Sequence, residues 1–415
     1  MLFRASVLLL PVVVLGGCVS HTVRSVDMTP PRQADEAVPE ELLFDVGVAV
    51  FDANVPEDYD EQIESNVAPE VRRAEANYLA YFLKNLLQTT GNWGAVRVVP
   101  RPTHAVDVNV EGTILHSDGE SLELEVEVSD ATGEQWFKKR YEGLASKYAY
   151  DESIPRNIDP FQAVYTAIAD DMLAYREQLT AQYVARVRTI AEMKFAREFA
   201  PDAFGEHVAE TGRGEFELTR LPATSDPMLV RVRRVREREY LFIDTLDEYF
   251  SDFQTTMFAP YHDWRRATYD EAIAYKELRA QARSRMVAGT AAIIGGIAAQ
   301  TSDNGAVAAS GTVGIIGGAL TLKSGISKRA EAQIHSEVLQ ELGVSAEAEI
   351  TPHTMELENQ TVQLSGTVDA QYEELKRVLR RIYYKELGLG SPDVVEPEIT
   401  DDATEGLKDT LEPDS

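Results

Sequence analysis

Two long stretches of the chain repeat apolar side chains at intervals of three and four residues. The first runs from Phe161 to Ile190 and the second from Val232 to Phe253. An α-helix turns once every 3.6 residues, so this spacing gathers the apolar side chains on one face. We therefore expect two long helices. The apolar face of the first packs either inside a bundle formed by this chain or against a second copy in an intermolecular coiled coil.

The ends of the second helix are marked by a capping residue and by proline. Asp226 followed by Pro227 is typical of a helix start, because aspartate caps free N–H groups and proline fits the first turn. Pro260 predicts an interruption, since proline lacks an N–H and disrupts a helix interior. These helices make residues 155–342 a long-helix region, which we expect to form a central bundle. Further helices are expected at Asp263–Ala288 and Lys323–Leu342.

Within that region, residues 286–326 are predicted to form a glycine-rich helical hairpin. Two uncharged arms, Met286–Ala299 and Val307–Leu322, flank a polar turn. Glycines on one helix face let two helices approach closely. Each glycine costs a soluble helix about 1 kcal/mol, so this many require a compensating role in packing. The glycines concerned are Gly289, Gly295, Gly296, Gly311, Gly314, Gly318 and Gly325.

Three interpretations of this hairpin are open. The arms can pack inside a bundle or an oligomer, insert into a membrane, or form a flexible low-complexity loop. Both arms are shorter than the ~20 residues that span a bilayer, although oligomer packing or local thinning accommodates some mismatch. The hairpin resembles the glycine-zipper segments of several outer-membrane lipoproteins. In the first two interpretations it serves self-association or membrane insertion.

Residues 41–150 alternate strand-like and helix-like patterns and predict a small α/β sandwich. A strand at 42–51 leads into an acidic loop, and Pro69 opens a helix that ends at Gly91. In a later strand, at 121–129, apolar and polar residues alternate strictly, so one face of the sheet meets water. The remaining strands are expected at 96–99, 104–115 and 135–141, with a hairpin turn at 130–133.

This order of elements resembles the periplasmic α/β domain shared by the curli secretion channel lipoprotein and the N-terminal domain of TolB. The resemblance covers residues 42–175. It depends on the opening strand that leads into an acidic loop, and on the turn Gly91-Asn92-Trp93 before the next strand. It implies a domain that binds partners and builds rings rather than one that performs chemistry.

The N-terminal residues predict export and lipid attachment. Arg4 precedes an apolar run, Val7–Leu15, whose length suits a signal peptide and is too short for a bilayer span. The sequence Leu15-Gly16-Gly17-Cys18 resembles the lipobox of bacterial lipoproteins, and Cys18 is the only cysteine of the chain. The resemblance implies that residues 1–18 contain the signal peptide and that Cys18 carries a covalent lipid. The alternative is an ordinary secretory signal with an incidental cysteine.

Two further segments complete the expected organisation. Residues 19–40 are polar and contain three prolines, which predicts an extended tether. Residues 343–390 predict a small α+β module, with a helix at 370–387, that resembles BON domains. Residues 391–415 hold nine acidic residues against one lysine and predict a disordered tail. The strands of the module are expected at 347–350, 354–357 and 361–368.

Charge and residue types narrow the function classes. The formal net charge is −29, which opposes binding to nucleic acid. The seven histidines show no metal-ligand spacing, and the HExxH, GxSxG and phosphate-loop motifs are absent from the sequence. One basic patch opens the second long helix, and it is either a solvated face paired with glutamates or a docking site for an anionic partner. Its residues are Arg231, Arg233, Arg234 and Arg236.

From these observations we expect an α+β protein without enzymatic activity and without a cofactor other than the lipid on Cys18. The favoured function is that of an outer-membrane lipoprotein facing the periplasm. It would be a structural or accessory component of a cell-envelope assembly or export complex, bound to the membrane by its lipid, in contact with envelope proteins and self-associated as a homo-oligomer. The alternatives are a monomeric periplasmic module that captures an envelope ligand through the arginine-rich helix, and an envelope hydrolase.

Overall fold

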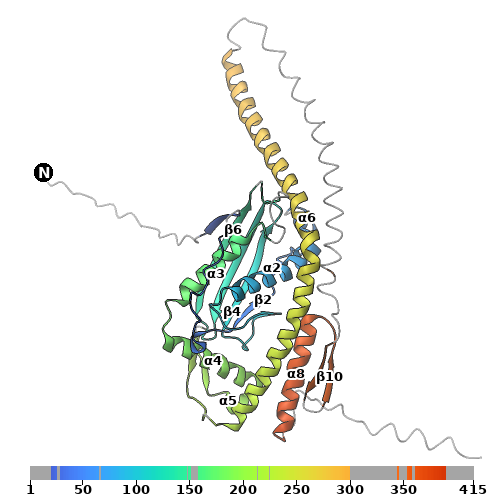
Figure 1. Ribbon diagram of the computed structural model, residues 1–415. Coiled ribbons are helices and arrows are strands. Elements are labelled where there is room, and N and C mark those ends of the chain that lie inside the picture. The colour runs from blue at the N-terminus through green and yellow to red at the C-terminus, as the bar shows by residue number, and fades with distance from the viewer. Residues whose placement is uncertain are drawn as a thin grey trace, which may run out of the picture.

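The computed structural model describes residues 20–25, 29–64, 67–146, 148–150, 158–212, 214–223, 225–299, 344, 353–357 and 360–388. They form an α+β fold in which helices cover one face of a mixed sheet (Figure 1). The strands of the main sheet are β1 (Ser20–Ser25), β2 (Val46–Ala49), β3 (Val96–Val99), β4 (Val108–Ser117), β5 (Ser121–Asp130) and β6 (Gln135–Ala145). The principal helices are α2 (Pro69–Thr89), α3 (Gln162–Arg176), α4 (Ala181–Phe199), α6 (Pro227–Ala299) and α8 (Val368–Glu386). The short elements are η1 (Glu40–Leu42), α1 (Tyr59–Glu64), α5 (Pro201–Phe204), β7 (Val208–Glu210), β8 (Phe216–Leu218), β9 (His353–Leu357) and β10 (Gln360–Leu364).

The main sheet has the strand order β1-β6-β5-β4-β2-β3. Strands β4, β5 and β6 form an antiparallel meander, whereas β2 is parallel to both β3 and β4. The parallel pair β2–β3 is connected through α2, which packs against both strands. Helix α3 lies beside α2 and covers the β6–β1 side of the sheet (Figure 1). The predicted sheet covered by a helix is therefore present, with a second helix added.

The opposite face of the sheet meets water, as the alternating sequence predicts. Leu122, Leu124, Val126 and Val128 of β5 are fully buried under the helices. The intervening glutamates point to the other face and pair with cations of β6. Lys138 Nζ lies 3.0 Å from Glu125 and 3.3 Å from Glu127, and Arg140 lies 3.0 Å from Glu123. These cross-strand ion pairs fix the register of the exposed face.

Helix α6 is one continuous helix of 73 residues, and the predicted break at Pro260 is wrong. Its start is as predicted, because the Asp226 carboxylate accepts from the N–H of Met228 at 2.8 Å. Pro260 removes one donor, but its neighbours Met257 and Tyr261 are buried against the body. Tertiary packing on both sides of the proline thus holds the helix together. At 1.5 Å per residue α6 is about 110 Å long, and its last turns rise beyond the sheet (Figure 1).

The predicted continuous helix over Phe161–Ile190 is interrupted. Helix α3 ends at Arg176, and α4 begins after Thr180, whose hydroxyl accepts from the N–H of Tyr183 at 3.2 Å. This cap turns the chain around the end of the sheet, where the Tyr183 hydroxyl donates to Asp130 at 2.9 Å. Within the described part of region 155–342, α4 packs on α6, whereas α3 packs on β6 and α6 also packs on β3 and α2.

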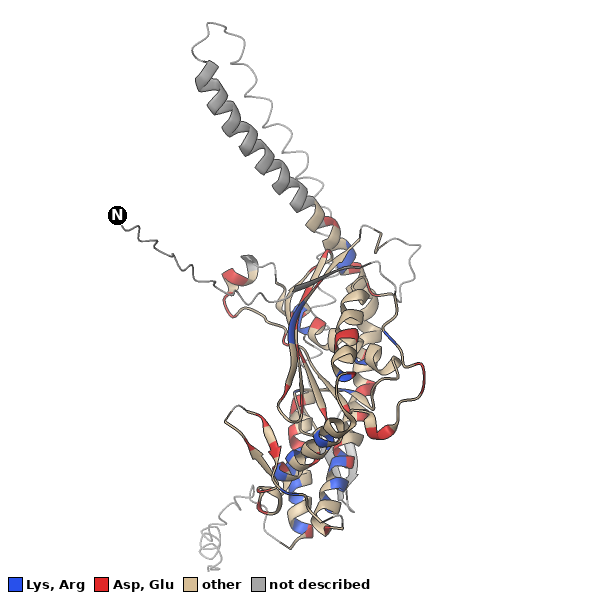
Figure 2. Cartoon of the chain, turned by 90° about the vertical axis from the view of Figure 1, so that its left-hand side faces the viewer, with Lys and Arg blue, Asp and Glu red and all other residues tan. Residues whose placement is uncertain are grey.

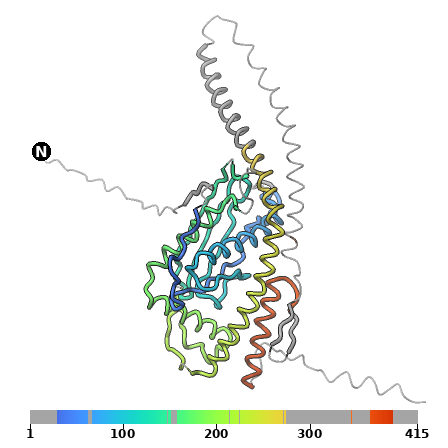
Figure 3. Tube along the Cα trace, in the orientation of Figure 1, coloured from blue at the N-terminus to red at the C-terminus, as the bar shows by residue number. Residues whose placement is uncertain are grey.

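Of the segment 19–40, which the sequence predicts to be a tether, the structure describes residues 20–25 and 29–40, and both parts contact the body. Residues 20–25 form β1, which pairs in parallel with β6. Further along, the Arg32 guanidinium lies 2.6 Å from Glu177, and its backbone N–H donates to Asp170 at 2.9 Å. The N–H of Ala34 donates to the carbonyl of Thr90. Residues 29–40 consequently run along the body (Figure 3).

The C-terminal helix also belongs to the body. Thr367 caps α8 by accepting from the N–H of Ala370, and α8 lies alongside α6 (Figure 3). Strands β9 and β10 form an antiparallel hairpin before it. One apolar core cluster includes Phe44, just before β2, and extends to Tyr384 in α8.

Several predictions lie outside the described residues. Cys18, the arm Val307–Leu322 and the acidic tail are among them, as are the predicted strand at 347–350 and helix at 323–342. Three of the hairpin glycines lie on α6, where the structure describes their backbone, namely Gly289, Gly295 and Gly296.

The tip of the β4–β5 hairpin provides a test of how α6 is seated. A Cβ on Gly119 would lie 1.8 Å from the carbonyl oxygen of Arg265 and 2.3 Å from the backbone nitrogen of Tyr269. We expect Gly119→Ala to lower the free energy of unfolding by about 1–3 kcal/mol, because the helix backbone cannot yield as a side chain would. Urea denaturation measures this loss. Gly212→Ala, which meets open space, is the matched control, and equal losses in both variants would contradict the close approach.

Candidate functional site

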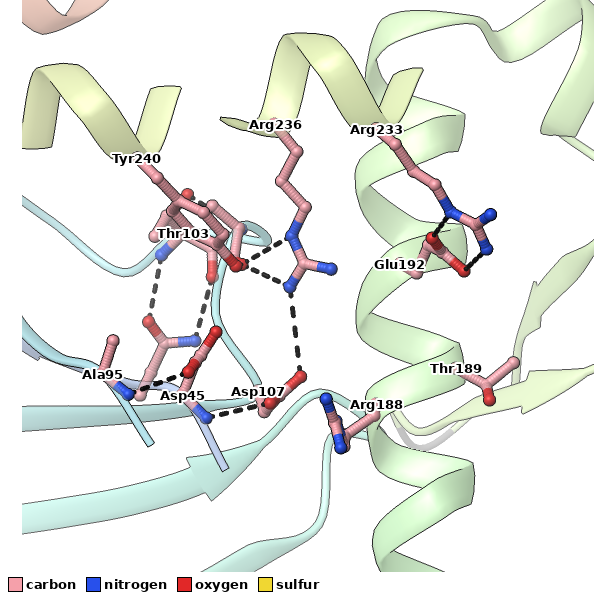
Figure 4. Close-up of polar contacts among 12 residues, drawn as sticks. Asp45, Ala95, Thr103, Asp107, Arg188, Thr189, Glu192, Arg233, Arg236 and Tyr240 are labelled. Atoms are coloured by element: carbon pink, nitrogen blue, oxygen red, sulfur yellow. Dashed lines mark hydrogen bonds and ion pairs between the residues drawn. The ribbon is translucent and has the colours of Figure 1, made fainter. Parts of the chain in front are cut away.

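The predicted basic patch at the start of α6 is largely engaged within the chain (Figure 4). The Arg233 guanidinium makes two hydrogen bonds, of 2.5 and 3.1 Å, to the Glu192 carboxylate on α4. Arg231 lies 3.7 Å from Glu386 on α8. Arg236 turns inward, and Arg234 is exposed. The helices at this end of the body carry both basic and acidic residues (Figure 2). Because Arg231, Arg233 and Arg236 contact other parts of the chain, the four arginines do not form one open surface.

Arg236 joins α6 to the start of the parallel strands. Its guanidinium donates twice to the carbonyl oxygen of Ala105 and lies 4.0 Å from the Asp107 carboxylate (Figure 4). The Asp107 carboxylate accepts from the N–H of Asp45, and the Asp45 carboxylate accepts from the N–H of Ala95. Two carboxylates therefore bind backbone donors where β2, β3 and β4 begin. The helix is connected to all three strands through this group.

Burial governs the charge of Asp107. Its side chain is almost completely enclosed, which raises its pKa to about 6 despite the hydrogen bond from Asp45 and the charge of Arg236. The unfolded chain releases this proton near the ordinary aspartate pKa. Between about pH 4 and pH 6 the native state therefore binds more protons than the unfolded state. The contribution of Asp107 to stability falls as the pH rises through that window.

A second polar group holds α8 against α6. Glu239 of α6 is fully buried, and its carboxylate accepts from the hydroxyl of Tyr372 at 2.5 Å. The same hydroxyl lies 3.0 Å from the hydroxyl of Thr103 in the β3–β4 loop. Burial raises the pKa of Glu239 against the opposing effects of Lys376 and of the Tyr372 hydrogen bond. Three segments far apart in the sequence thus meet at one carboxyl group.

Ion pairs surround this group and extend it to α4. Lys376 of α8 donates to Glu198 of α4 at 2.7 Å, and His104 lies 3.3 Å from the same carboxylate. Burial alone would raise the pKa of Glu198, but the His104 hydrogen bond and the Lys376 charge outweigh it and lower the pKa to about 2. Arg101 pairs with Glu373 at the rim. Helix α8 is therefore held by partners from several elements.

A third polar group fixes α6 further along its length. Arg265 forms an ion pair of 2.9 Å with Asp159, and both side chains are 1% exposed. The guanidinium lies over the ring of Tyr261 at 3.8 Å, and this cation–π contact offsets part of the cost of burial. The Tyr261 hydroxyl donates to Glu75 of α2 at 2.6 Å, and Glu75 also accepts from Ser117 of β4. This group therefore connects α6 to β4 and to α2.

A pocket lies at the carboxyl ends of the parallel strands β2 and β3. Its volume is about 340 Å³. Phe51 and Phe250 contribute to an apolar lining, while Arg73 and Asn77 of α2 and Asp369 of α8 add polar groups. Open sheets of this type often bind ligands at this edge. The lining offers one cation and one carboxylate, so it favours neither an anionic nor a cationic ligand.

In the part of the chain that the structure describes, no three His, Cys, Asp or Glu side chains gather as a metal site would require. The helices of that part include none that combines the length and apolarity needed to cross a bilayer. In the three polar groups described above, each carboxylate accepts from donors on other elements. The three groups therefore join α6 to the sheet, to α2 and to α8.

Comparison with known proteins gives no relative. No family model matches the chain, and no curated protein and no solved structure matches it. The resemblances drawn from the sequence accordingly stay hypotheses.

Sequence reasoning identified the arginines of α6 but missed their partners. The groups around Glu239 and Arg265 join residues more than one hundred positions apart, as in Tyr372–Glu239 and Arg265–Asp159. A buried charge on an apolar helix face was the available signal, because Glu239 falls within the three-four spacing of Val232–Phe253. An ionisable residue on such a face requires a partner.

The hydroxyl of Tyr372 tests the attachment of α8. We expect Tyr372→Phe to destabilise α8 by about 1–3 kcal/mol, because the buried Glu239 carboxyl loses its closest donor. Hydrogen exchange should then be faster at the amides of α8 and unchanged at those of α2. Tyr383→Phe is the matched control on the same helix, since the Tyr383 hydroxyl has no hydrogen-bond partner among the described residues. Wild-type exchange in Tyr372→Phe would contradict this role.

Asp107 predicts a pH dependence of stability. The Asp107→Asn variant cannot ionise, so it should not lose stability as the pH rises from 4 to 7. Relative to wild type, its free energy of unfolding should therefore rise across that range by on the order of 2 kcal/mol. Denaturation at several pH values measures the difference. The exposed Asp202→Asn is the control, and a wild-type pH profile in Asp107→Asn would refute the assignment.

Proposed function

We propose that this chain is a lipid-anchored, non-enzymatic component of the bacterial cell envelope that self-associates through the distal part of α6 and the hairpin at 286–326. In this proposal it faces the periplasm from the outer membrane, and it serves as a structural or accessory part of an assembly or export complex. The observation that carries the proposal is the continuity of α6, which leads from the buried core directly into the uncharged, glycine-containing residues Met286–Ala299.

The attachment of α6 to the body supports a scaffolding role. Arg236, Glu239 and Tyr261 hold the helix at successive levels against the sheet, α8 and α2. Arg265 adds an ion pair with Asp159. A helix held by directional polar contacts on several elements has a defined rotation and register. In this proposal the distal part of α6 leaves the body in the direction that these contacts set. This is a useful property for a part that packs against identical copies.

The glycine spacing supports self-association. Gly289 and Gly296 are seven residues apart, so they fall on the same face of α6. A face lined by glycine brings two helix backbones into close contact and replaces side-chain bulk with van der Waals packing. Gly295 lies about 100° around the helix from Gly296, beside that face. The helix-propensity cost of three glycines within eight residues is about 3 kcal/mol, which packing between copies would offset.

The first residues supply the membrane attachment in this proposal. Cys18 follows a signal-peptide-like apolar run and two glycines, and the lipobox resemblance makes its thiol the acceptor of a diacylglycerol group.

The alternative function, capture of an anionic ligand through the arginines at the start of α6, has less support. Arg233 and Arg236 already bind Glu192 and the Ala105 carbonyl oxygen.

Metabolic labelling tests the attachment. Cells that express the wild-type chain should incorporate radiolabelled palmitate into it, and Cys18→Ser should abolish incorporation because no other thiol exists in the chain. The wild-type protein should sediment with outer membranes, whereas the variant should not be acylated. Equal absence of label in both proteins would overturn lipid anchoring.

Paired substitutions on α6 test self-association. We expect Gly289→Leu with Gly296→Leu to shift the detergent-solubilised protein toward monomer in crosslinking and light scattering, because leucine keeps two helices apart. Leucine also favours helix over glycine, so helix loss would not explain the shift. Ala291→Leu with Ala298→Leu is the matched control, with the same spacing on the other side of the helix. A monomeric wild-type protein would contradict the proposal.

A further inference from the structure

The pocket at the carboxyl ends of β2 and β3 lies where open sheets bind ligands. From the end of β2 the chain leads through α2 to β3, whereas the neighbouring strand β4 leads to β5 on the other side of the sheet. Sheets whose connections diverge in this way often bind ligands outside the carboxyl ends of their strands. The volume of about 340 Å³ is at the lower end of the range for ligand pockets, so it favours a small ligand.

The segment that follows β2 is held by β4, so this wall of the pocket is formed before a ligand binds. The N–H of Asp52 donates to the carbonyl oxygen of Gly112 at 2.7 Å, and the N–H of Ile114 donates to the carbonyl oxygen of Asp52 at 2.9 Å. The Asn54 side chain donates to the carbonyl oxygen of Ile114 at 3.2 Å. The ring of Phe51 packs closely on Gly112, where a Cβ would lie 2.7 Å from it. A ligand therefore need not order this segment on binding.

Most of the lining is apolar. Phe51 follows β2 and Phe250 lies on α6, and both side chains are almost completely buried. Ala53 and Val368 extend this lining from the end of β2 and from the start of α8. An apolar group that enters the pocket leaves water and contacts carbon atoms, which favours binding.

The charged groups of the lining come from two helices. Arg73 lies on α2, and Asp369 lies in the first turn of α8. Among the described residues the exposed Asp369 carboxylate has no ion-pair partner, so Arg73 does not neutralise it. The Arg73 guanidinium has five N–H donors, so it can bind a ligand carboxylate and keep its contact within the chain. Asn77, one turn further along α2, adds an amide.

A ligand with both charges suits this lining better than an ion of either sign. A simple anion would be repelled by Asp369, and a simple cation would be repelled by Arg73. A carboxylate and an ammonium on one small molecule can each face the opposite charge. An apolar side chain on the same molecule would occupy the space beside Phe51 and Phe250. These three parts occur together in an apolar amino acid and in a dipeptide of such residues.

We propose that this pocket binds a zwitterionic amino acid or dipeptide with apolar side chains. Arg73 binds the ligand carboxylate, Asp369 binds the ammonium group, and Phe51 and Phe250 contact the apolar side chain. This binding activity goes beyond the proposed function and depends on neither the lipid on Cys18 nor self-association. Because Arg73 and Asp369 lie on different helices, the ligand would also connect α2 to α8.

Equilibrium dialysis of the purified full chain tests the inference with leucine, dileucine and two leucine derivatives. N-acetylleucine lacks the ammonium group, and leucinamide lacks the carboxylate. Leucine or dileucine should bind, and each derivative should bind on the order of tenfold more weakly than leucine, because one charged contact is lost. The affinities of leucine and dileucine, compared directly, distinguish a free amino acid from a peptide as the source of the ligand.

Two substitutions locate the binding in this pocket. Asp369→Asn should weaken the binding of leucine about tenfold and should not weaken that of N-acetylleucine, which has no ammonium group. Ala53→Leu should weaken the binding of both, because the larger side chain fills the pocket. Asp252→Asn is the matched control, since this exposed carboxylate lies two residues after Phe250 and does not line the pocket.

Three results would overturn the inference. The first is that neither leucine nor dileucine binds to the wild-type chain. The second is equal affinity for leucine and its two derivatives, which would mean that the charges are not recognised. The third is an unchanged affinity for leucine in Asp369→Asn. Palmitate labelling and crosslinking do not involve this pocket, so failure here and failure of the proposed function are distinguishable.

Discussion

The buried contacts between α6 and the rest of the body are the constraint on which this structure depends. Glu239 and Arg265 are almost completely removed from water, and each is stabilised by groups from other elements. A buried charge without its partner costs several kcal/mol, so loss of either partner would destabilise the packing of α6. They define one position of α6 relative to the sheet, whereas apolar packing alone tolerates small shifts.

This constraint connects the fold to the proposed function. A helix of 73 residues cannot bury its whole length in a body of this size, so one part packs and the other extends. The part held by Arg236, Glu239 and Arg265 gives the extended part its direction. Met286–Ala299 then follow on the same helix without a charged residue. In this account the body holds α6 so that its uncharged, glycine-containing end, Met286–Ala299, extends away from the sheet.

The sequence predicts local structure well and tertiary partners poorly. The alternation in β5 correctly predicts a sheet with one wet face, and Asp226 correctly marks the start of α6. Pro260 misleads because Met257 and Tyr261 pack on either side of it, and the three-four spacing cannot reveal that Thr180 caps a new helix. Tyr372 meets Glu239 across 133 residues, and the pocket at the ends of β2 and β3 also needs distant segments. Periodicity holds no information on such pairings.

Hydrogen exchange of the intact chain, measured above and below the concentration at which it associates, tests the central claim most directly. The account predicts slow exchange at amides 228–270 at both concentrations, because the body holds that part of α6. Amides 286–299 should be protected in the associated protein and exchange faster in the dilute protein. Fast exchange throughout 228–270 would contradict the seating of α6 on the body, and exchange at 286–299 that is indifferent to concentration would contradict self-association through that part of the helix.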